Sequence, residues 1–137
     1  MTFMLDTDIC IYTIKRKPIR VLNRLEKCQP GMVVMSAITF AELINGARKS
    51  QRVEDNLRRL NALSELIEVL PFDKDAALTY GSVRSNLEKR GLIIGGNDLF
   101  IAAHALSLNV TLVTNNEREF SRVDGLKVEN WVEGNGR

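Results

Sequence analysis

The 137-residue sequence lacks long apolar runs, a dense set of cysteines and an excess of charge of either sign. No run approaches the ~20 apolar residues that a membrane helix needs, and Asp6 interrupts the start too early for a signal peptide. We therefore expect a cytoplasmic protein. The length fits one domain, which we expect over residues 1–133 with a flexible tail over 134–137.

Cysteine and histidine are also scarce, with two cysteines and one histidine in the chain. We place Cys10 and Cys28 in helical segments, and they form no Cys-x-x-Cys pair, so neither a disulfide scaffold nor a zinc site is expected. His104 stands among small apolar residues and is assigned to packing or to the surface.

The basic and acidic residues nearly balance, with 19 against 17, so net charge alone does not indicate a nucleic-acid partner. Basic residues do gather in two short segments. These residues are Lys15, Arg16, Lys17, Lys89 and Arg90. They either solvate helix ends or bind a phosphate backbone.

Short apolar runs predict strands over residues 3–5, 32–35, 67–70 and 110–113, and a weaker run predicts a fifth over 127–129. The runs are nearly unbroken, which is typical of a parallel sheet covered by helices on both faces. Apolar residues recur at helical spacing between the runs. We expect an α/β fold of three layers around a parallel sheet of four to five strands.

Acidic residues follow the predicted strands at comparable places. They are Asp6 and Asp8 after the first strand, Glu42 after the second, Asp98 at the start of a later helix, and Glu119 after the fourth strand. The carboxyl ends of parallel strands share one edge, where ligand sites are generally built. We therefore expect these acids to meet.

Each acid also has an ordinary structural interpretation. Asp8 is a candidate helix cap, and residues 39–42 match a capping box in which Glu42 bonds back to Thr39. Asp98 is favoured at a helix start by the macrodipole, and Glu119 fits a plain surface position. Asp6 is harder to explain in this way, because it directly follows an apolar strand.

Crowded carboxylates repel one another unless they are protonated, paired or neutralised by a cation. Oxygen ligands without histidine or cysteine suit Mg2+ or Mn2+, which also bind phosphate oxygens. This pattern favours phosphoryl-transfer chemistry.

Four motifs in order resemble the PIN-domain ribonucleases, specifically VapC-type toxins of bacterial toxin-antitoxin pairs. They are Phe3-Met4-Leu5-Asp6-Thr7-Asp8, Ser36-Ala37-Ile38-Thr39-Phe40-Ala41-Glu42-Leu43, Gly95-Gly96-Asn97-Asp98-Leu99-Phe100-Ile101-Ala102, and Val113-Thr114-Asn115-Asn116 through Glu119-Phe120. The likeness spans essentially the whole chain.

The resemblance implies a metal-dependent endoribonuclease with Asp6, Glu42 and Asp98 as its acidic centre, using Mg2+ that Mn2+ can replace. Many members have a fourth acid after the threonine of the last motif, where this chain has Asn116. Either Asn116 holds a metal-bound water or Glu119 supplies the charge. Asp8 stands where the pattern usually has Asn, and an acid there either strengthens metal binding or disturbs the site.

The resemblance also implies a small VapB-type antitoxin, a toxin homodimer and structured RNA as substrate, with the anticodon stem-loop of the initiator tRNA as the expected target. Cleavage there would inhibit translation. The basic segments would then receive the RNA backbone. A single histidine cannot supply the pair that the 2'-hydroxyl route uses, so we expect 5'-phosphate and 3'-hydroxyl ends.

Two alternatives stay open at this point. The Asp6-Thr7-Asp8 motif also resembles the nucleophile motif of haloacid-dehalogenase-type phosphatases, although Cys10 stands where those enzymes have threonine or valine. The other alternative is a PIN module that has lost catalysis and only binds RNA or protein, which Asn116 and Asp8 would favour.

Overall fold

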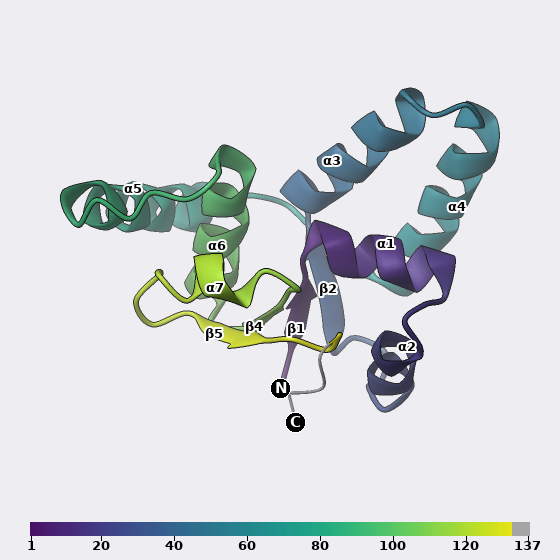
Figure 1. Cartoon of the computed structure of the whole chain (residues 1–137), viewed down its shortest axis with the longest axis horizontal. Helices are drawn as coiled ribbons and strands as arrows, with labels where there is room; N and C mark the ends of the chain where they lie inside the picture. The colour runs from purple at the N-terminus through teal and green to yellow at the C-terminus, as the bar shows by residue number, and fades with distance from the viewer. Residues whose placement is uncertain (133–137) are drawn as a thin grey trace.

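The computed structural model describes residues 1–132 and contains a parallel five-stranded sheet in the order β3-β2-β1-β4-β5 (Figure 1). The strands are β1 (Phe3–Leu5), β2 (Val33–Ser36), β3 (Glu68–Leu70), β4 (Thr111–Val113) and β5 (Lys127–Glu129). The α/β prediction is therefore confirmed, and β2, β3 and β4 each begin one residue later than predicted. The tail predicted over 134–137 lies outside the described residues, as does position 133.

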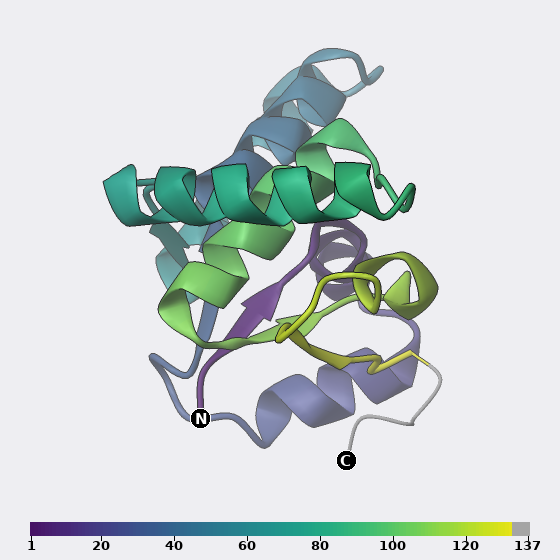
Figure 2. The ribbon, with the colours of Figure 1, turned by 90° about the vertical axis from the view of Figure 1, so that its left-hand side faces the viewer.

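Seven helices within residues 1–132 cover the sheet. They are α1 (Thr7–Lys15), α2 (Ile19–Glu26), α3 (Ala37–Arg48), α4 (Val53–Leu66), α5 (Lys74–Lys89), α6 (Gly96–Leu108) and α7 (Glu117–Phe120). Figure 1 shows α1 to α4 on one side of the sheet and α5 and α6 on the other, and in Figure 2 α5 crosses over α6.

Alternating side chains of the central strands enter two separate apolar cores. Phe3 and Leu5 of β1 join the core beneath α1 to α4, whereas Met4 between them joins the core beneath α5 and α6. Val113 and Leu112 of β4 divide in the same way. Since both faces of β1, β2 and β4 are buried, the apolar runs of these strands have no polar alternation.

The two cysteines and the one histidine lie mostly in the protein interior. Cys10 is buried in α1, but the helical prediction for Cys28 is wrong, because α2 ends at Glu26 and Cys28 lies in the following turn. His104 of α6 is 1% exposed, and its Nδ1 lies 2.8 Å from the hydroxyl oxygen of Ser36, so it has a packing role. None of the helices over residues 1–132 is both long and apolar enough to cross a membrane.

Candidate active site

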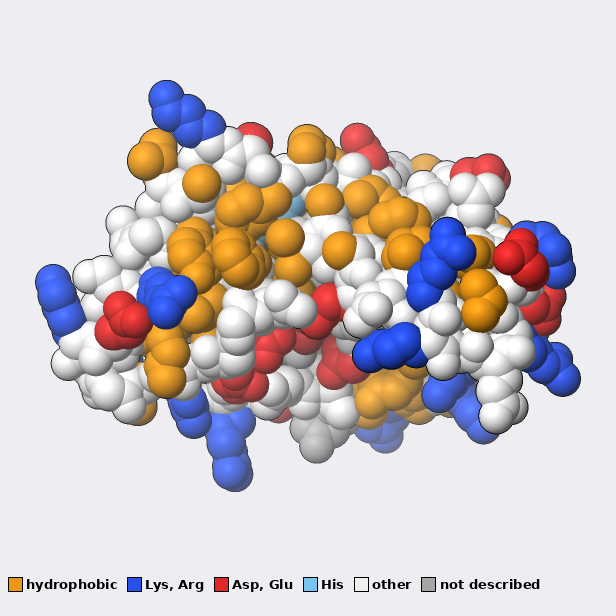
Figure 3. Space-filling view, turned by 90° about the horizontal axis from the view of Figure 1, so that it is seen from above, with side chains coloured by type: hydrophobic (Ala, Val, Ile, Leu, Met, Phe, Trp, Pro, Cys, Tyr) orange, Lys and Arg blue, Asp and Glu red, His pale blue; other side chains and the backbone are white. Residues whose placement is uncertain are grey.

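The carboxyl edge of the sheet brings together acids from four segments of the chain. Asp6 directly follows β1 and caps α1, Glu42 lies on α3 after β2, Asp98 lies in the first turn of α6, and Glu119 lies on α7 after β4. Figure 3 shows acidic side chains gathered near the middle of this face, between an apolar patch and the basic side chains. The predicted convergence is thus present.

Asp6 is the most buried of these acids, with 6% of its surface exposed. One carboxylate oxygen accepts a hydrogen bond from the Thr7 N–H at 2.8 Å, and the other accepts from the Thr114 hydroxyl at 2.7 Å. Burial, and next the charge of Asp8, raise the pKa of Asp6 to about 7 in spite of these bonds. The carboxylate is therefore fixed in place while its negative charge is poorly stabilised.

Asp8 does not cap the first helix, because Asp6 is the capping residue and Asp8 lies in the first turn of α1. Its Oδ2 accepts from the Asn115 N–H at 3.3 Å. Its Oδ1 is buried without a hydrogen-bond partner among residues 1–132, and burial raises the pKa of this carboxyl as well. A buried acceptor without a donor is costly, and a cation would satisfy it.

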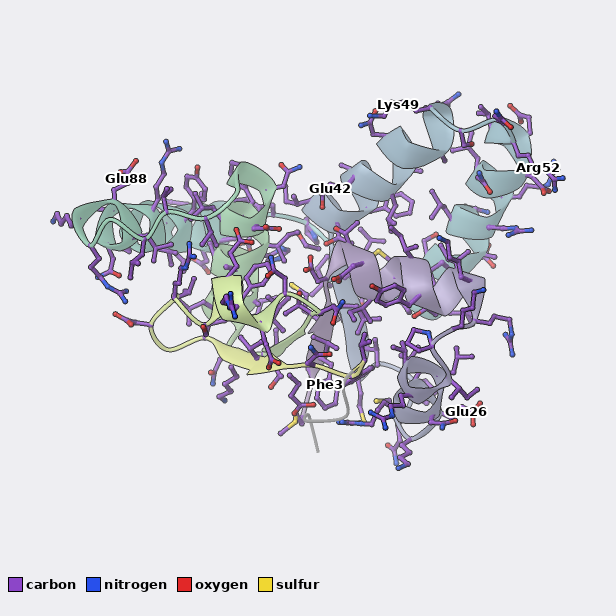
Figure 4. The ribbon with its side chains drawn as sticks, viewed as in Figure 1. Phe3, Glu26, Glu42, Lys49, Arg52 and Glu88 are labelled. Carbon is purple, nitrogen blue, oxygen red and sulfur yellow. The ribbon has the colours of Figure 1, made fainter. Side chains whose placement is uncertain are left out.

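Glu42 does not complete a capping box, because α3 begins earlier than residues 39–42 indicate. The Ser36 hydroxyl caps α3 by accepting from the Ile38 N–H at 3.0 Å, which places Glu42 in the second turn. The Glu42 carboxylate accepts from the Thr7 hydroxyl and, at 2.9 Å, from the Asn97 side-chain amide. Glu42 therefore joins α1, α3 and α6 at the site, as Figure 4 shows from its place at the base of α3.

Asp98 and Glu119 form a close acidic pair. Burial raises the pKa of Asp98 to about 6, and the charge of Glu119 is the next cause. Glu119 is oriented by the Gly95 N–H, which donates to it at 2.7 Å, and by the side-chain amide of Asn116. Glu119 thus lies beside Asp98, while Asn116 holds Glu119.

Gly95 lines this pair closely. A Cβ built on it would lie 3.2 Å from Oδ2 of Asp98 and 3.7 Å from Oε1 of Glu119. A side chain at this position would therefore press on both carboxylates. The absence of one keeps the space around Asp98 open.

The acidic centre has no basic partner among the described residues. The ion pairs found in residues 1–132 involve other acids, such as Asp55 and Glu129. The carboxylates of the acidic centre bond to hydroxyl and amide donors. Within residues 1–132, no three side chains of His, Cys, Asp or Glu are already arranged to hold a metal ion. An all-oxygen donor set with an orphaned buried oxygen nevertheless fits a hard divalent cation.

The two basic segments lie on opposite sides of the molecule. Lys15, at the end of α1, lines a groove together with Glu42, and Arg16 and Lys17 follow it. Lys89 follows Glu88, which Figure 4 labels at the far end of α5. The Arg90 guanidinium donates to the Asn86 side chain at 2.8 Å and to the Arg122 carbonyl at 3.1 Å, so Arg90 also joins the end of α5 to the segment after α7.

The structure adds hydroxyl and amide donors that the sequence analysis did not single out. They are Thr7, Asn97, Thr114 and Asn115, each bonded to one of the acids. All four lie within the motifs quoted for the resemblance. Thr7 and Asn97 are next to Asp6 and Asp98 in the sequence, which is a signal that could have identified them, whereas Thr114 and Asn115 have no acid beside them.

Comparison with known proteins agrees with this geometry. The PIN domain family model matches residues 3–126. A ribonuclease VapC2 of Rickettsia felis is 43% identical over 132 residues, covering 96% of this chain and 98% of that protein. A tRNA(fMet)-specific endonuclease VapC of Shigella flexneri is 46% identical over 131 residues, with coverage of 96% and 98%.

Solved structures give the same result. The VapBC2 complex of Rickettsia felis, bound to a DNA fragment from its promoter, matches with a TM-score of 0.90 and 42% identity, covering 96% of this chain and 99% of that one. VapBC-1 of nontypeable Haemophilus influenzae matches with a TM-score of 0.87 and 44% identity, with coverage of 96% and 98%.

These matches replace the haloacid-dehalogenase interpretation of Asp6-Thr7-Asp8, because the matched family covers nearly the whole chain. PIN-domain nucleases generally depend on a divalent metal. The buried, unpaired carboxylates and the similarity over 96% of the chain agree, and the chain belongs to the PIN-domain family, among the VapC ribonucleases.

Proposed function

We propose that this protein is the toxin of a toxin-antitoxin pair and cleaves structured RNA at its acidic centre, with Mg2+ as the cofactor and Mn2+ as a substitute. The anticodon stem-loop of the initiator tRNA is the proposed target, and cleavage there inhibits translation. The observation that carries the proposal is the convergence of Asp6, Glu42, Asp98 and Glu119, which form no ion pair with a basic side chain of residues 1–132.

Asp6 and Asp98 are the proposed cation ligands, with Asp8 and Glu119 beside them. A bound divalent cation supplies the positive charge that a phosphodiester needs as negative charge develops on it. The chain prepares this position by fixing Asp6 between Thr7 and Thr114, so the carboxylate does not have to be oriented at the moment of binding.

Glu42 is the proposed residue for orienting the attacking water, or alternatively for holding a second cation. Its two oxygens are fixed by Thr7 and Asn97, and each keeps a lone pair for a further donor. His104 is buried and bonded to Ser36, so it is not available to donate a proton to RNA. The proposed products are therefore a 5'-phosphate and a 3'-hydroxyl.

A VapB-type antitoxin is the proposed protein partner, on the strength of the solved VapBC complexes of the relatives. A homodimer is proposed as well. The surface that supports it is apolar, with Leu78 65% exposed on α5 and Ile93 48% exposed before α6. Sedimentation of the purified chain tests this, and Leu78→Glu is expected to shift a dimer toward monomer.

Cleavage of the initiator tRNA tests the proposed function. The parent protein is incubated with the tRNA in Mg2+, in Mn2+ and in excess EDTA, and the RNA ends are sequenced. Cleavage at one anticodon position with either metal, and none in EDTA, is the expected result. Cleavage that persists undiminished in EDTA would overturn the metal mechanism, and an intact tRNA would overturn the substrate.

A further inference from the structure

A groove of about 430 Å³ lies between α1, α3 and α4, directly beside the acidic centre. Thr7 and Glu42 belong to both places, because they line the groove and also bond to each other. Figure 1 shows α1 passing beneath the space where α3 and α4 diverge. Whatever occupies the groove is therefore adjacent to the bond that the acidic centre cleaves.

The walls of this groove are mostly aliphatic. Ile11 from α1, Leu43 from α3 and Leu60 from α4 face it from three sides, and Ile11 is 37% exposed. Aliphatic walls of this kind hold a flat base that has left its stack, as in enzymes that act on extruded nucleotides. Sequence-specific RNA recognition generally uses such unpaired bases.

The charges around the groove suit a phosphate backbone. Lys15 and Arg59 line it, and Glu42 is the one acid among the lining residues that the structure describes. Arg59 is 58% exposed and its Nη2 is 4.0 Å from the nearest Asp55 oxygen, whereas the neighbouring Arg58 approaches Asp55 to 3.2 Å. The Arg59 guanidinium therefore has donors left for a phosphate.

A fixed amide completes the lining. Asn56 donates through Nδ2 to the Ser50 hydroxyl at 2.9 Å, and that hydroxyl donates to the Ala47 carbonyl at 2.7 Å. Within residues 1–132 no donor is bonded to Oδ1 of Asn56, so this oxygen is oriented and open. It can accept from the amino or imino group of a base edge.

We propose that this groove binds one unpaired nucleotide of the RNA substrate, next to the scissile phosphate, with its base between the aliphatic walls and its phosphates on Lys15 and Arg59. The inference rests on the proposed function and adds a specificity site to it. A protein segment is the competing occupant. Two cations against one acid, the oriented Asn56 oxygen and the continuity with Glu42 favour the nucleotide.

Gly46 allows the groove to be filled without disturbing the fold. It lines the groove on α3, and a Cβ built there meets nothing within 4 Å. Gly46→Leu therefore places a side chain in the groove. Ala62→Leu is the matched control, because Ala62 is an exposed position of α4 that does not line the groove.

The probe is a fluorescent anticodon stem-loop of the initiator tRNA. Binding is measured by anisotropy in an Asp98→Asn background, so that the RNA stays intact, and cleavage is measured in the parent background. Gly46→Leu is expected to weaken binding by about 5- to 150-fold, the range for losing one held base, while Ala62→Leu leaves it near the parent value. Melting temperatures verify that both variants are folded.

A set of abasic probes locates the base. One abasic position beside the cleavage site should weaken parental binding, and the same position should have little further effect with Gly46→Leu, because that base is already excluded. Arg59→Gln should lower the salt dependence of binding by about one phosphate contact, unlike Arg58→Gln, which removes the same charge outside the groove. This second pair of variants tests the proposal even if Gly46→Leu does not fold.

The outcomes separate the two proposals. A parent protein that cleaves no RNA would refute the proposed function, while the binding measurements still decide the groove. Equal affinity of Gly46→Leu and Ala62→Leu for the stem-loop would overturn the nucleotide site. Independent effects of Gly46→Leu and of every abasic position on binding would do the same, and a protein segment would then be the favoured occupant of the groove.

Discussion

Two carboxylate sites in this molecule differ in whether a positively charged side chain lies beside them. At the sheet edge formed by β5, Glu129 lies 3.0 Å from the Arg24 guanidinium, which also covers the Trp131 ring at 5.0 Å. At the acidic centre, burial leaves the pKa of Asp6 at about 7 and that of Asp98 at about 6. The first site has an arginine from its own chain, whereas the donors to the second, among the residues that the structure describes, are hydroxyl and amide groups.

The difference indicates what each site is for. A partly buried acid that only stabilises the fold is paired within the chain, as Glu129 is. Acids that bind a cation from solution have to stay unpaired, and the folded protein loses stability as a result. The acidic centre is therefore a site where stability has been given up for function.

The largest expected effect comes from exchanging carboxylate for amide at both sites. Glu42→Gln should lower RNA cleavage by about 100-fold or more, while the free energy of unfolding without metal stays equal or rises by about 1 kcal/mol. Glu129→Gln should leave cleavage near the parent rate but lower the free energy of unfolding by about 1.5 kcal/mol, because Arg24 loses its partner. Cleavage rates and urea unfolding measure both.

Equal changes in cleavage rate and in stability for the two variants would contradict this prediction. A Glu42→Gln protein that is folded and cleaves normally would show that Glu42 has a purely structural role. A Glu129→Gln protein that is stable but inactive would show that cleavage depends on the Glu129 site rather than on the acidic centre alone.

The pH dependence of stability should also differ between the metal-free and the metal-bound protein. Because folding raises the pKa values of Asp6 and Asp98 above 3.8, the folded state holds more protons than the unfolded state between pH ~4 and ~7. The metal-free free energy of unfolding is therefore highest at the acidic end and falls as the pH rises, by about 1.4 kcal/mol for each unit of raised pKa.

Melting curves in EDTA across this pH range measure the decline. Asp6→Asn should remove a large part of it, because the amide does not titrate. Saturating Mg2+ should reduce the decline in the parent. A decline of equal size in Asp6→Asn would show that other groups cause it.

Much of this arrangement follows from sequence patterns. Unbroken apolar runs predicted β1 and β4, because both faces of those strands are buried. The acids directly after strands predicted the site, since parallel strands end at one edge. The local role of Glu42 was not settled by its pattern, because Thr39 and Glu42 have capping-box spacing while Ser36 is the residue that caps α3.

The donors around the acids were harder to predict for a physical reason. Thr114 bonds to Asp6 across 108 positions of sequence, and Asn97 bonds to Glu42 across 55. Such pairs depend on the register of β1 against β4 and on the residue at which α6 starts. Neither can be predicted from local secondary-structure propensity. The groove beside Glu42 was missed for the same reason, because it requires α1, α3 and α4 at once.

A smaller effect is expected at Gly95, where an added side chain would fill the space beside the Asp98 carboxylate. Gly95→Ala places a Cβ 3.2 Å from the Asp98 carboxylate and should slow cleavage about tenfold, with a change in stability of less than about 1 kcal/mol. Gly96→Ala is the control, since its Cβ meets nothing within 4 Å. Equal cleavage by the two variants would contradict the importance of this space.

The smallest effect separates the two basic residues at the end of α5. Arg90 bonds to Asn86, to the Arg122 carbonyl and to Asp124, so Arg90→Gln should lower the free energy of unfolding by about 0.5 kcal/mol. Lys89→Gln should leave stability unchanged and lower the salt dependence of RNA binding by about one contact. An unchanged salt dependence would make Lys89 a solvated surface residue.

The central claim is that the acids are kept unpaired for a divalent cation on which cleavage depends. The most direct measurement follows the cleavage rate and the melting temperature of the parent and of Asp98→Asn against Mn2+ concentration. In the parent, both quantities should rise together over the same concentration range. Asp98→Asn should melt higher than the parent without metal, gain little from Mn2+ and cleave slower by orders of magnitude. A folded Asp98→Asn protein that cleaves near the parental rate would contradict the account.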